Sequence, residues 1–202
     1  SLIDKSRVMQ IPFEGMTLLD YAINASLVIS NIAIRKDDKA GLVTFQDKVS
    51  SILPASKRNK QMHLIMEALY KEKTAFREAD FSRLYATLTR KLHQRSLLLL
   101  FTNFETLSGL ERQMPYLKRM AKSHLLVVIF FENTQVEDLL ENVPGKTREI
   151  YDKAIAEKLV FEKHQIVREI RQHGIHTILT APENLTVNTI NKYLELKSRG
   201  LI

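Results

Sequence analysis

Cysteine is absent from this chain of 202 residues. The absence excludes a disulfide-stapled scaffold, cysteine-ligated zinc or iron–sulfur centres, and thiol catalysis, and it favours a reducing compartment. The longest apolar runs, Leu97–Phe101 and Leu125–Phe131, are far shorter than the roughly 20 apolar residues of a transmembrane helix, so we interpret them as buried strands. No signal peptide is visible, and the chain starts at Ser1 rather than Met, which indicates a processed or excised chain.

Charge is unevenly distributed in an otherwise ordinary globular composition. The net charge is +7, with 45% apolar and 26% charged residues. Between Lys57 and Arg95 there are ten Lys or Arg and four acidic residues, which accounts for +6 of the total. A basic surface can face nucleic acid, anionic lipid or an acidic protein, or it can simply be solvated. No RNA-binding aromatic signature or zinc finger accompanies it, so we expect no nucleic-acid partner.

Four segments are continuously apolar and are separated by helical patterns. This alternation predicts an α/β sheet of mostly parallel strands with helices on both faces. A fifth strand, Val49–Leu53, follows a connection tight enough for a hairpin and is predicted to be antiparallel at an edge. The four buried strands are predicted at Gly41–Phe45, Leu97–Thr102, Leu125–Phe131 and Ile175–Leu179.

Capping residues predict where the helices begin and end. Asp80 is the expected N-cap of a helix over Phe81–Leu92. Thr147 is expected to begin a long helix to Gln172, which His173-Gly174 would close. Thr186 is expected to begin the last helix. The segment Asn142–Lys146, which contains a proline and a glycine, is the best candidate for a loop. Capping boxes are predicted at Thr17 with Asp20, Ser108 with Glu111, and Thr134 with Glu137.

The first strand, ending at Leu2-Ile3-Asp4, is unusually short for a strand inside a sheet, since strands average about 5–6 residues. We therefore expect one domain over residues 1–202 that forms the C-terminal part of a longer protein. Its six histidines are scattered, and no nucleophile and base can be paired, so enzyme activity is not expected.

Polar side chains follow several of the predicted strands. Ligands of open α/β sheets bind beyond the carboxyl ends of the strands, where strand order reverses. Asp4 and Ser6 follow the first strand, Thr102 and Asn103 follow another, and Asp80 precedes a helix. Carboxylate, hydroxyl and amide oxygens suit a hard divalent cation. The alternative for each residue is structural: an N-cap for Asp80, loop hydrogen bonds for Asp4 and Ser6, and a turn for Asn103.

Asp4-x-Ser6 after a strand resembles the Asp-x-Ser-x-Ser opening of von Willebrand factor A-like domains, where it forms a metal-ion-dependent adhesion site. The whole pattern is closer to the domain-of-unknown-function 58 family, bacterial proteins with this fold. The resemblance implies a Rossmann-like three-layer sandwich, and it rests on Asp4–Met9, Leu19–Ala25, Gly41–Phe45, Glu78–Phe81 and Arg95–Asn103, with His124–Leu126 and Tyr193–Lys197 extending it.

The sequence departs from the adhesion-site pattern at two positions. The second serine of the opening motif is Val8, and the aspartate expected after Phe101-Thr102 is Asn103. The remaining metal ligands would be Asp4, Ser6, Asp80 and Asn103, a degenerate site with only two carboxylates. Because affinity depends on ligand charge, binding of Mg²⁺, Mn²⁺ or Ca²⁺ would be weak.

The resemblance implies a non-enzymatic protein-interaction module. Such proteins typically act with a MoxR-type AAA+ ATPase in the assembly or maturation of other proteins, at the cytoplasmic face of the bacterial inner membrane. Membrane contact would come only through segments outside this chain. The basic residues Lys57, Arg58 and Lys60 could meet the ATPase or anionic lipid. The alternatives are a metal-independent structural domain of a membrane-linked assembly and a metal-dependent phosphoesterase, which would need more converging carboxylates.

Overall fold

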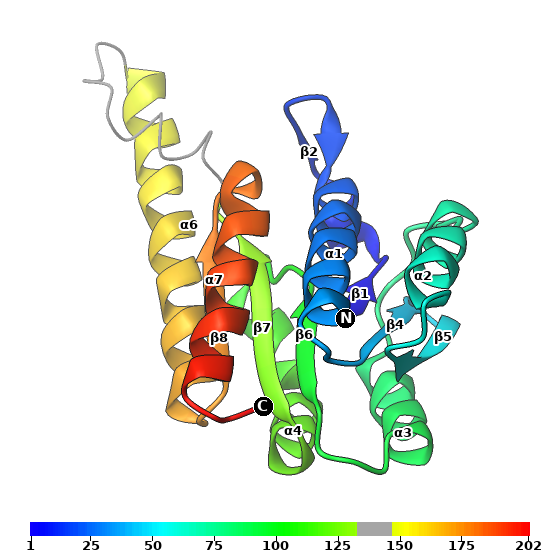
Figure 1. Ribbon diagram of the computed structural model, residues 1–202. Coiled ribbons are helices and arrows are strands. Elements are labelled where there is room, and N and C mark those ends of the chain that lie inside the picture. Colours follow the sequence, from blue (N-terminus) through cyan, green and yellow to red (C-terminus); the bar gives the residue numbers. More distant parts are fainter. Residues whose placement is uncertain (133–146) are drawn as a thin grey trace.

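The computed structural model describes residues 1–132 and 147–202 of the chain. A six-stranded sheet with the order β5-β4-β1-β6-β7-β8 runs through the middle (Figure 1). Only β5 is antiparallel to its neighbour, as predicted for the edge strand. The strands are β1 (Leu2–Asp4), β4 (Ala40–Phe45), β5 (Val49–Ser56), β6 (Leu97–Phe101), β7 (Leu125–Phe131) and β8 (His176–Thr180).

Helices cover both faces of the sheet, which gives the three-layer architecture that the alternation of strands and helices predicts. One layer packs α1 (Leu18–Arg35), α2 (Gln61–Tyr70) and α7 (Leu185–Ser198) against the sheet. The other packs α3 (Phe81–Lys91), α4 (Leu107–Ser123) and α6 (Thr147–Gln172). A small hairpin of β2 (Pro12–Phe13) and β3 (Met16–Thr17) precedes α1.

The continuous apolar runs of β6 and β7 are explained by these two layers. Leu98 and Leu100 point into the core under α3 and α4, whereas Leu99 and Phe101 point into the core under α1 and α7. Successive side chains of a strand point to opposite faces, so a strand covered on both sides must be apolar at every position. The same alternation holds in β7 from Leu126 to Phe131.

Strand boundaries differ slightly from the predictions. The predicted strand over Leu97–Thr102 ends at Phe101, and the last strand runs over His176–Thr180 rather than Ile175–Leu179. The edge strand extends beyond Leu53 to Ser56. Pro54 does not stop it, because a proline is tolerated on an edge strand, where its missing N–H removes no ladder bond that the sheet needs.

Three predicted helix signals are confirmed. Thr17 and Asp20 form a reciprocal capping box, and the Asp80 carboxylate accepts the backbone N–H of Arg83 at 2.9 Å. The long helix spans Thr147–Gln172, and Gly174 follows it with a left-handed φ of 72°. The predicted cap at Thr134 and the predicted loop at Asn142–Lys146 lie outside the described residues.

Two predicted helix starts are wrong. Thr106, not Ser108, caps α4, and its hydroxyl accepts the N–H of Gly109 at 3.1 Å. Ser108 already lies inside the first turn, because only four residues separate the end of β6 from the cap. Likewise α7 begins at Leu185 rather than at Thr186, since the 3₁₀ turn Pro182–Asn184 delivers the chain in helical geometry.

Candidate functional site

The candidate site lies where strand order reverses in the sheet. The strand β1 lies between β4 and β6, with Ile3 paired to both Thr44 and Phe101. Residues that follow β1 and β6 therefore meet at the same edge, which we call the rim. Asp4, Ser6, Thr102 and Asn103 all line a rim cavity of about 130 Å³.

Asp4 is the buried carboxylate of the rim, with 1% of its surface exposed. Its Oδ1 accepts the backbone N–H of Ser6 at 2.8 Å, and its Oδ2 accepts the hydroxyl of Thr102 at 2.6 Å. Burial raises the pKa of Asp4, although the hydrogen bonds from Thr102 and Ser6 oppose the rise. Both carboxylate oxygens are thus engaged by donors of the fold.

Asn103 binds a cation that belongs to the chain itself. Its Oδ1 accepts the ammonium of Lys163 at 2.7 Å, and the same ammonium donates to the carbonyl of Phe104 at 2.6 Å. Burial lowers the pKa of Lys163 to about 8, against the opposing charges of Glu105 and Glu162. The amide oxygen predicted to bind a metal is therefore occupied by a side chain from α6.

Asp80 is separated from the other three predicted ligands. It lines the adjoining cavity of about 490 Å³, together with Asp47 and Glu78. Its two oxygens are bound to its own helix, Oδ1 by the N–H of Arg83 and Oδ2 by the Arg83 guanidinium at 3.0 Å. The structure thus brings Asp4, Ser6 and Asn103 to one cavity and leaves Asp80 beside it.

These residues fit a hydrated divalent cation poorly. Such an ion takes six or more oxygen ligands and favours carboxylates. Of the predicted ligands, only Asp4 brings a carboxylate to this cavity, and it already accepts two hydrogen bonds. Glu78 and Glu105 also line the cavity, and Glu78 is paired with Arg7. Among the described residues, no three His, Cys, Asp or Glu side chains are grouped so that they could hold a metal ion. The metal site of Asp4, Ser6, Asp80 and Asn103 stays a prediction.

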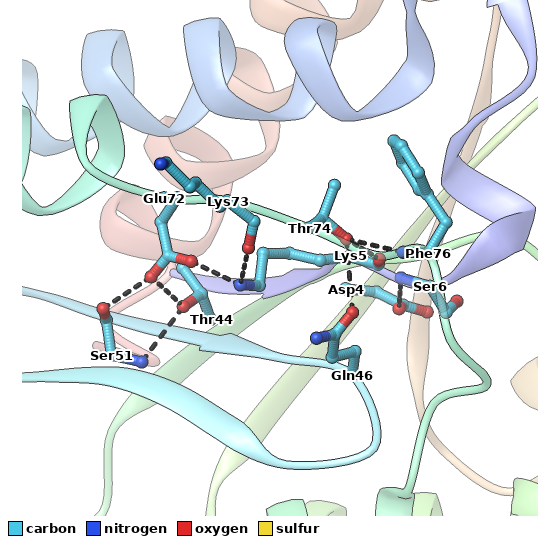
Figure 2. A network of polar contacts seen from close by, with 10 residues as sticks. All are labelled: Asp4, Lys5, Ser6, Thr44, Gln46, Ser51, Glu72, Lys73, Thr74 and Phe76. Atoms are coloured by element: carbon cyan, nitrogen blue, oxygen red, sulfur yellow. Dashed lines mark hydrogen bonds and ion pairs between the residues drawn. The ribbon is translucent and has the colours of Figure 1, made fainter.

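A buried ion pair next to the rim was not predicted from the sequence. Lys5 extends away from the rim cavity and pairs with Glu72 (Figure 2). The Glu72 carboxylate also accepts the hydroxyls of Thr44 and Ser51. Burial alone would raise the pKa of Glu72, but the ammonium and the two hydroxyls hold it below its ordinary value. The available signal was a lysine between Asp4 and Ser6 at the end of a buried strand.

The segment between α2 and α3 crosses the rim and is tied to β1. The Thr74 hydroxyl donates to the carbonyl of Lys5 at 2.7 Å and accepts the N–H of Phe76 at 3.0 Å (Figure 2). Phe76 in turn forms a backbone bridge with Ser6. These contacts set the position of Glu78, which lines both rim cavities.

The basic stretch from Lys57 to Arg95 does not form one face. Ser56 pairs with Ala40 at the start of β4, so the exposed residues Lys57, Arg58 and Lys60 lie near the end of the sheet opposite the rim. Several other members are paired with acids: Lys71 with Glu67, Arg77 with Asp47, and Arg83 with Asp80.

Comparison with known proteins identifies the family. The sequence model of the family described as "Protein of unknown function DUF58" matches residues 2–173. The chain belongs to the DUF58 family. The solved structure titled "Crystal Structure of the SpRpn10 VWA domain" is 16% identical to this DUF58 chain, with 95% of this chain and 92% of that chain covered at a TM-score of 0.54. The DUF58 chain therefore has a von Willebrand factor A-like fold.

Two further solved structures are similar to the DUF58 chain. An aerotolerance-related membrane protein from Bacteroides fragilis is 15% identical, with 64% of each chain covered and a TM-score of 0.47. An uncharacterized membrane spanning protein from Vibrio fischeri is 14% identical, with 96% of this chain and 95% of that chain covered and a TM-score of 0.33. No curated protein matches the chain. Among the described helices, none combines the length and apolar character of a membrane span.

Proposed function

We propose that this DUF58 domain is a protein-interaction module and not an enzyme. The observation that carries the proposal is the internal pairing of the rim. Asp4 is held by Ser6 and Thr102, and Asn103 is held by Lys163. Groups locked in this way form a rigid surface, whereas a reacting centre needs a nucleophile or base free to exchange a proton with its substrate.

The partner's contact would be an acidic side chain at Arg112. This exposed arginine lines both rim cavities and makes no ion pair with any described residue. Across the smaller cavity, Arg7 and Glu78 are already 3.9 Å apart as an exposed ion pair. A planar guanidinium binds a carboxylate through two parallel hydrogen bonds, which provides directional recognition without a metal.

We further propose that the partner is a MoxR-type AAA+ ATPase, with which the bacterial protein assists the assembly or maturation of other proteins. Membership of the DUF58 family supports this role. We place the domain at the cytoplasmic face of the inner membrane, with membrane contact only through segments outside this chain.

Binding of the full protein to its MoxR-type ATPase, measured by isothermal titration, tests the proposal. Arg112→Glu should weaken binding by about tenfold or more, which corresponds to about 1.4 kcal/mol. Lys118→Glu is the matched control, because it makes the same charge change on α4 without lining either rim cavity. Equal losses in the two variants would contradict a contact at the rim, and no binding by the wild type would remove the ATPase as partner.

The basic residues at the other end of the sheet have a separate test. Reversing Lys57, Arg58 and Lys60 to Glu should weaken binding to the ATPase or to anionic liposomes at low salt. Unchanged binding would assign these residues to the solvated surface.

Titration with Mg²⁺ or Mn²⁺ tests the metal-dependent form of the proposal. Saturable binding that Asp4→Ala abolishes would show that the rim captures its partner through a metal. Absence of heat at millimolar metal would leave either the metal-independent rim contact or a purely structural domain, and the Arg112→Glu measurement distinguishes these two.

A further inference from the structure

A further cavity, separate from the two at the rim, lies at the opposite end of the sheet, between the C-terminal ends of α3 and α4. Its volume is about 300 Å³, and the connection from α3 to β6 closes one side. Leu88, Leu92 and Met120 provide its apolar lining. Its polar lining includes Arg95, Arg119, His93 and His124, and none of the described acidic residues lines it.

The surroundings of this cavity are strongly basic. From Phe81 to Ser96, which covers α3 and the connection to β6, the sequence contains no Asp or Glu. The only acid of α4 is Glu111, in its first half. The C-terminal halves of α3 and α4, with the connection from α3 to β6, carry six basic residues: Arg90, Lys91, Arg95, Lys118, Arg119 and Lys122. An anion that enters the cavity therefore meets a positive potential from both walls.

The two arginines that line the cavity are not engaged elsewhere. Neither Arg95 nor Arg119 makes an ion pair or a hydrogen bond with the described residues. Arg119 is instead positioned by the ring of Tyr85, with its guanidinium carbon 5.8 Å from the ring centre.

His124 is the second sign of a missing ligand. Only 7% of its surface is exposed, and its Nδ1 is buried without a hydrogen-bonding partner in the described part of the chain. Burying a polar atom without a partner is energetically costly, so such atoms are rare in folded proteins. The hydroxyl of Ser96, which directly precedes β6, does not donate to it, because this hydroxyl donates to the carbonyl of Gln94.

We propose that this cavity binds a phosphate monoester group between Arg95 and Arg119. A phosphate monoester carries about −1.5 to −2 charges at neutral pH and has three acceptor oxygens, so donors that approach from two walls can all be satisfied. A single carboxylate would leave most of them unused. The apolar side chains of Leu88, Leu92 and Met120 would contact the organic part of the ligand. This site is independent of the rim and of any partner bound there.

Titration with inorganic phosphate and with glycerol 3-phosphate, followed by calorimetry, tests the site on the full chain. The Arg95→Gln/Arg119→Gln variant should lose affinity by about tenfold or more. The matched control is Lys118→Gln/Lys122→Gln, which removes the same charge from the same surface outside the cavity. Its affinity should change by less than about threefold through weakened long-range attraction. Equal losses in both variants, or no saturable binding by the wild type, would overturn the proposal.

A measurement on the wild-type chain avoids any effect of the substitutions on folding. In NMR spectra, the Nε–H signals of Arg95 and Arg119 and the ring signals of His124 should shift saturably with glycerol 3-phosphate. Shifts spread evenly over all surface arginines would contradict a localised site.

The phosphate group could belong to a lipid headgroup or to a soluble metabolite, and binding to vesicles distinguishes these two sources. Binding to phosphatidylcholine vesicles that contain phosphatidic acid, but not to those with phosphatidylglycerol, identifies a lipid headgroup, whereas binding of the soluble esters alone identifies a free metabolite.

Discussion

Lys5 and Glu72 form an ion pair inside the protein, with 2% and 8% of their side-chain surfaces exposed. Lys5 directly follows β1 and lies between the rim residues Asp4 and Ser6, whereas Glu72 lies in the segment between α2 and α3. The pair therefore joins the rim to a segment far along the chain. Two buried charges are tolerated because Glu72 also receives hydroxyl donors from Thr44 and Ser51.

Breaking this pair should destabilise the domain strongly. Lys5→Met leaves the Glu72 carboxylate buried without its counter-ion, and we expect a loss of about 3–5 kcal/mol in the free energy of unfolding. Lys71→Met is the matched control, since Lys71 pairs with Glu67 on the exposed face of α2 and should cost less than about 0.5 kcal/mol. Urea unfolding of both variants measures the difference, and similar small losses would mean that Glu72 finds other partners. The double variant Lys5→Met/Glu72→Gln should be more stable than the sum of the single losses predicts.

Glu72 should also make stability depend on pH in the acid range. The pKa of Glu72 in the folded protein lies below its ordinary value, so the unfolded chain binds the proton more readily than the folded one. The stabilisation from Glu72 is therefore complete above the unfolded pKa and is lost as pH falls through the folded pKa. Unfolding free energies measured across this range should fall less steeply with acid in Glu72→Gln than in the wild type. Parallel curves for the two proteins would show that the pair does not perturb the Glu72 pKa.

Much of the fold follows from local patterns in the sequence. The apolar runs of β6 and β7 and the caps at Thr17 and Asp80 each depend on a few neighbouring residues, and they were predicted correctly. The errors at Ser108 and Thr186 have a common cause. More than one residue near each helix start can accept an N–H, and the choice depends on where the preceding strand or turn delivers the chain.

The candidate site was less predictable because its partners are distant in sequence. Convergence of Asp4 and Asn103 followed from the rule for strand ends, and the structure agrees. The Lys163 ammonium on Asn103 lies 60 positions away, and the Lys5 pair with Glu72 spans 67 positions. No local spacing encodes such contacts, since they arise from the packing of α6 and of the rim segment on the sheet.

The two candidate caps of α4 can be separated by experiment. Thr106→Ala removes the hydroxyl that accepts the Gly109 N–H, and we expect it to lower the free energy of unfolding by about 1 kcal/mol. Ser108→Ala lies within the first turn and should change it by less than about 0.5 kcal/mol. The opposite order of the two effects, measured by denaturant unfolding, would restore Ser108 as the cap.

Gly41 in β4 should be difficult to replace even by alanine. A Cβ added there would lie 2.8 Å from the backbone nitrogen of Ala55 and 2.9 Å from the carbonyl oxygen of Leu53, so Gly41→Ala must push β5 away from β4. The register between these strands shifts at this point, which indicates that the close approach is part of the edge geometry.

We expect Gly41→Ala to cost about 1–3 kcal/mol, as overpacking usually does, and to increase amide hydrogen exchange along β5. Gly174→Ala is the control, because its cost comes from a left-handed φ of 72° with open space around the new Cβ. It should therefore destabilise the domain without selectively exposing β5. If amide hydrogen exchange in β5 is the same in Gly41→Ala as in the wild type, β4 and β5 can separate enough to admit the methyl group. This edge of the sheet would then be more adaptable than its backbone contacts imply.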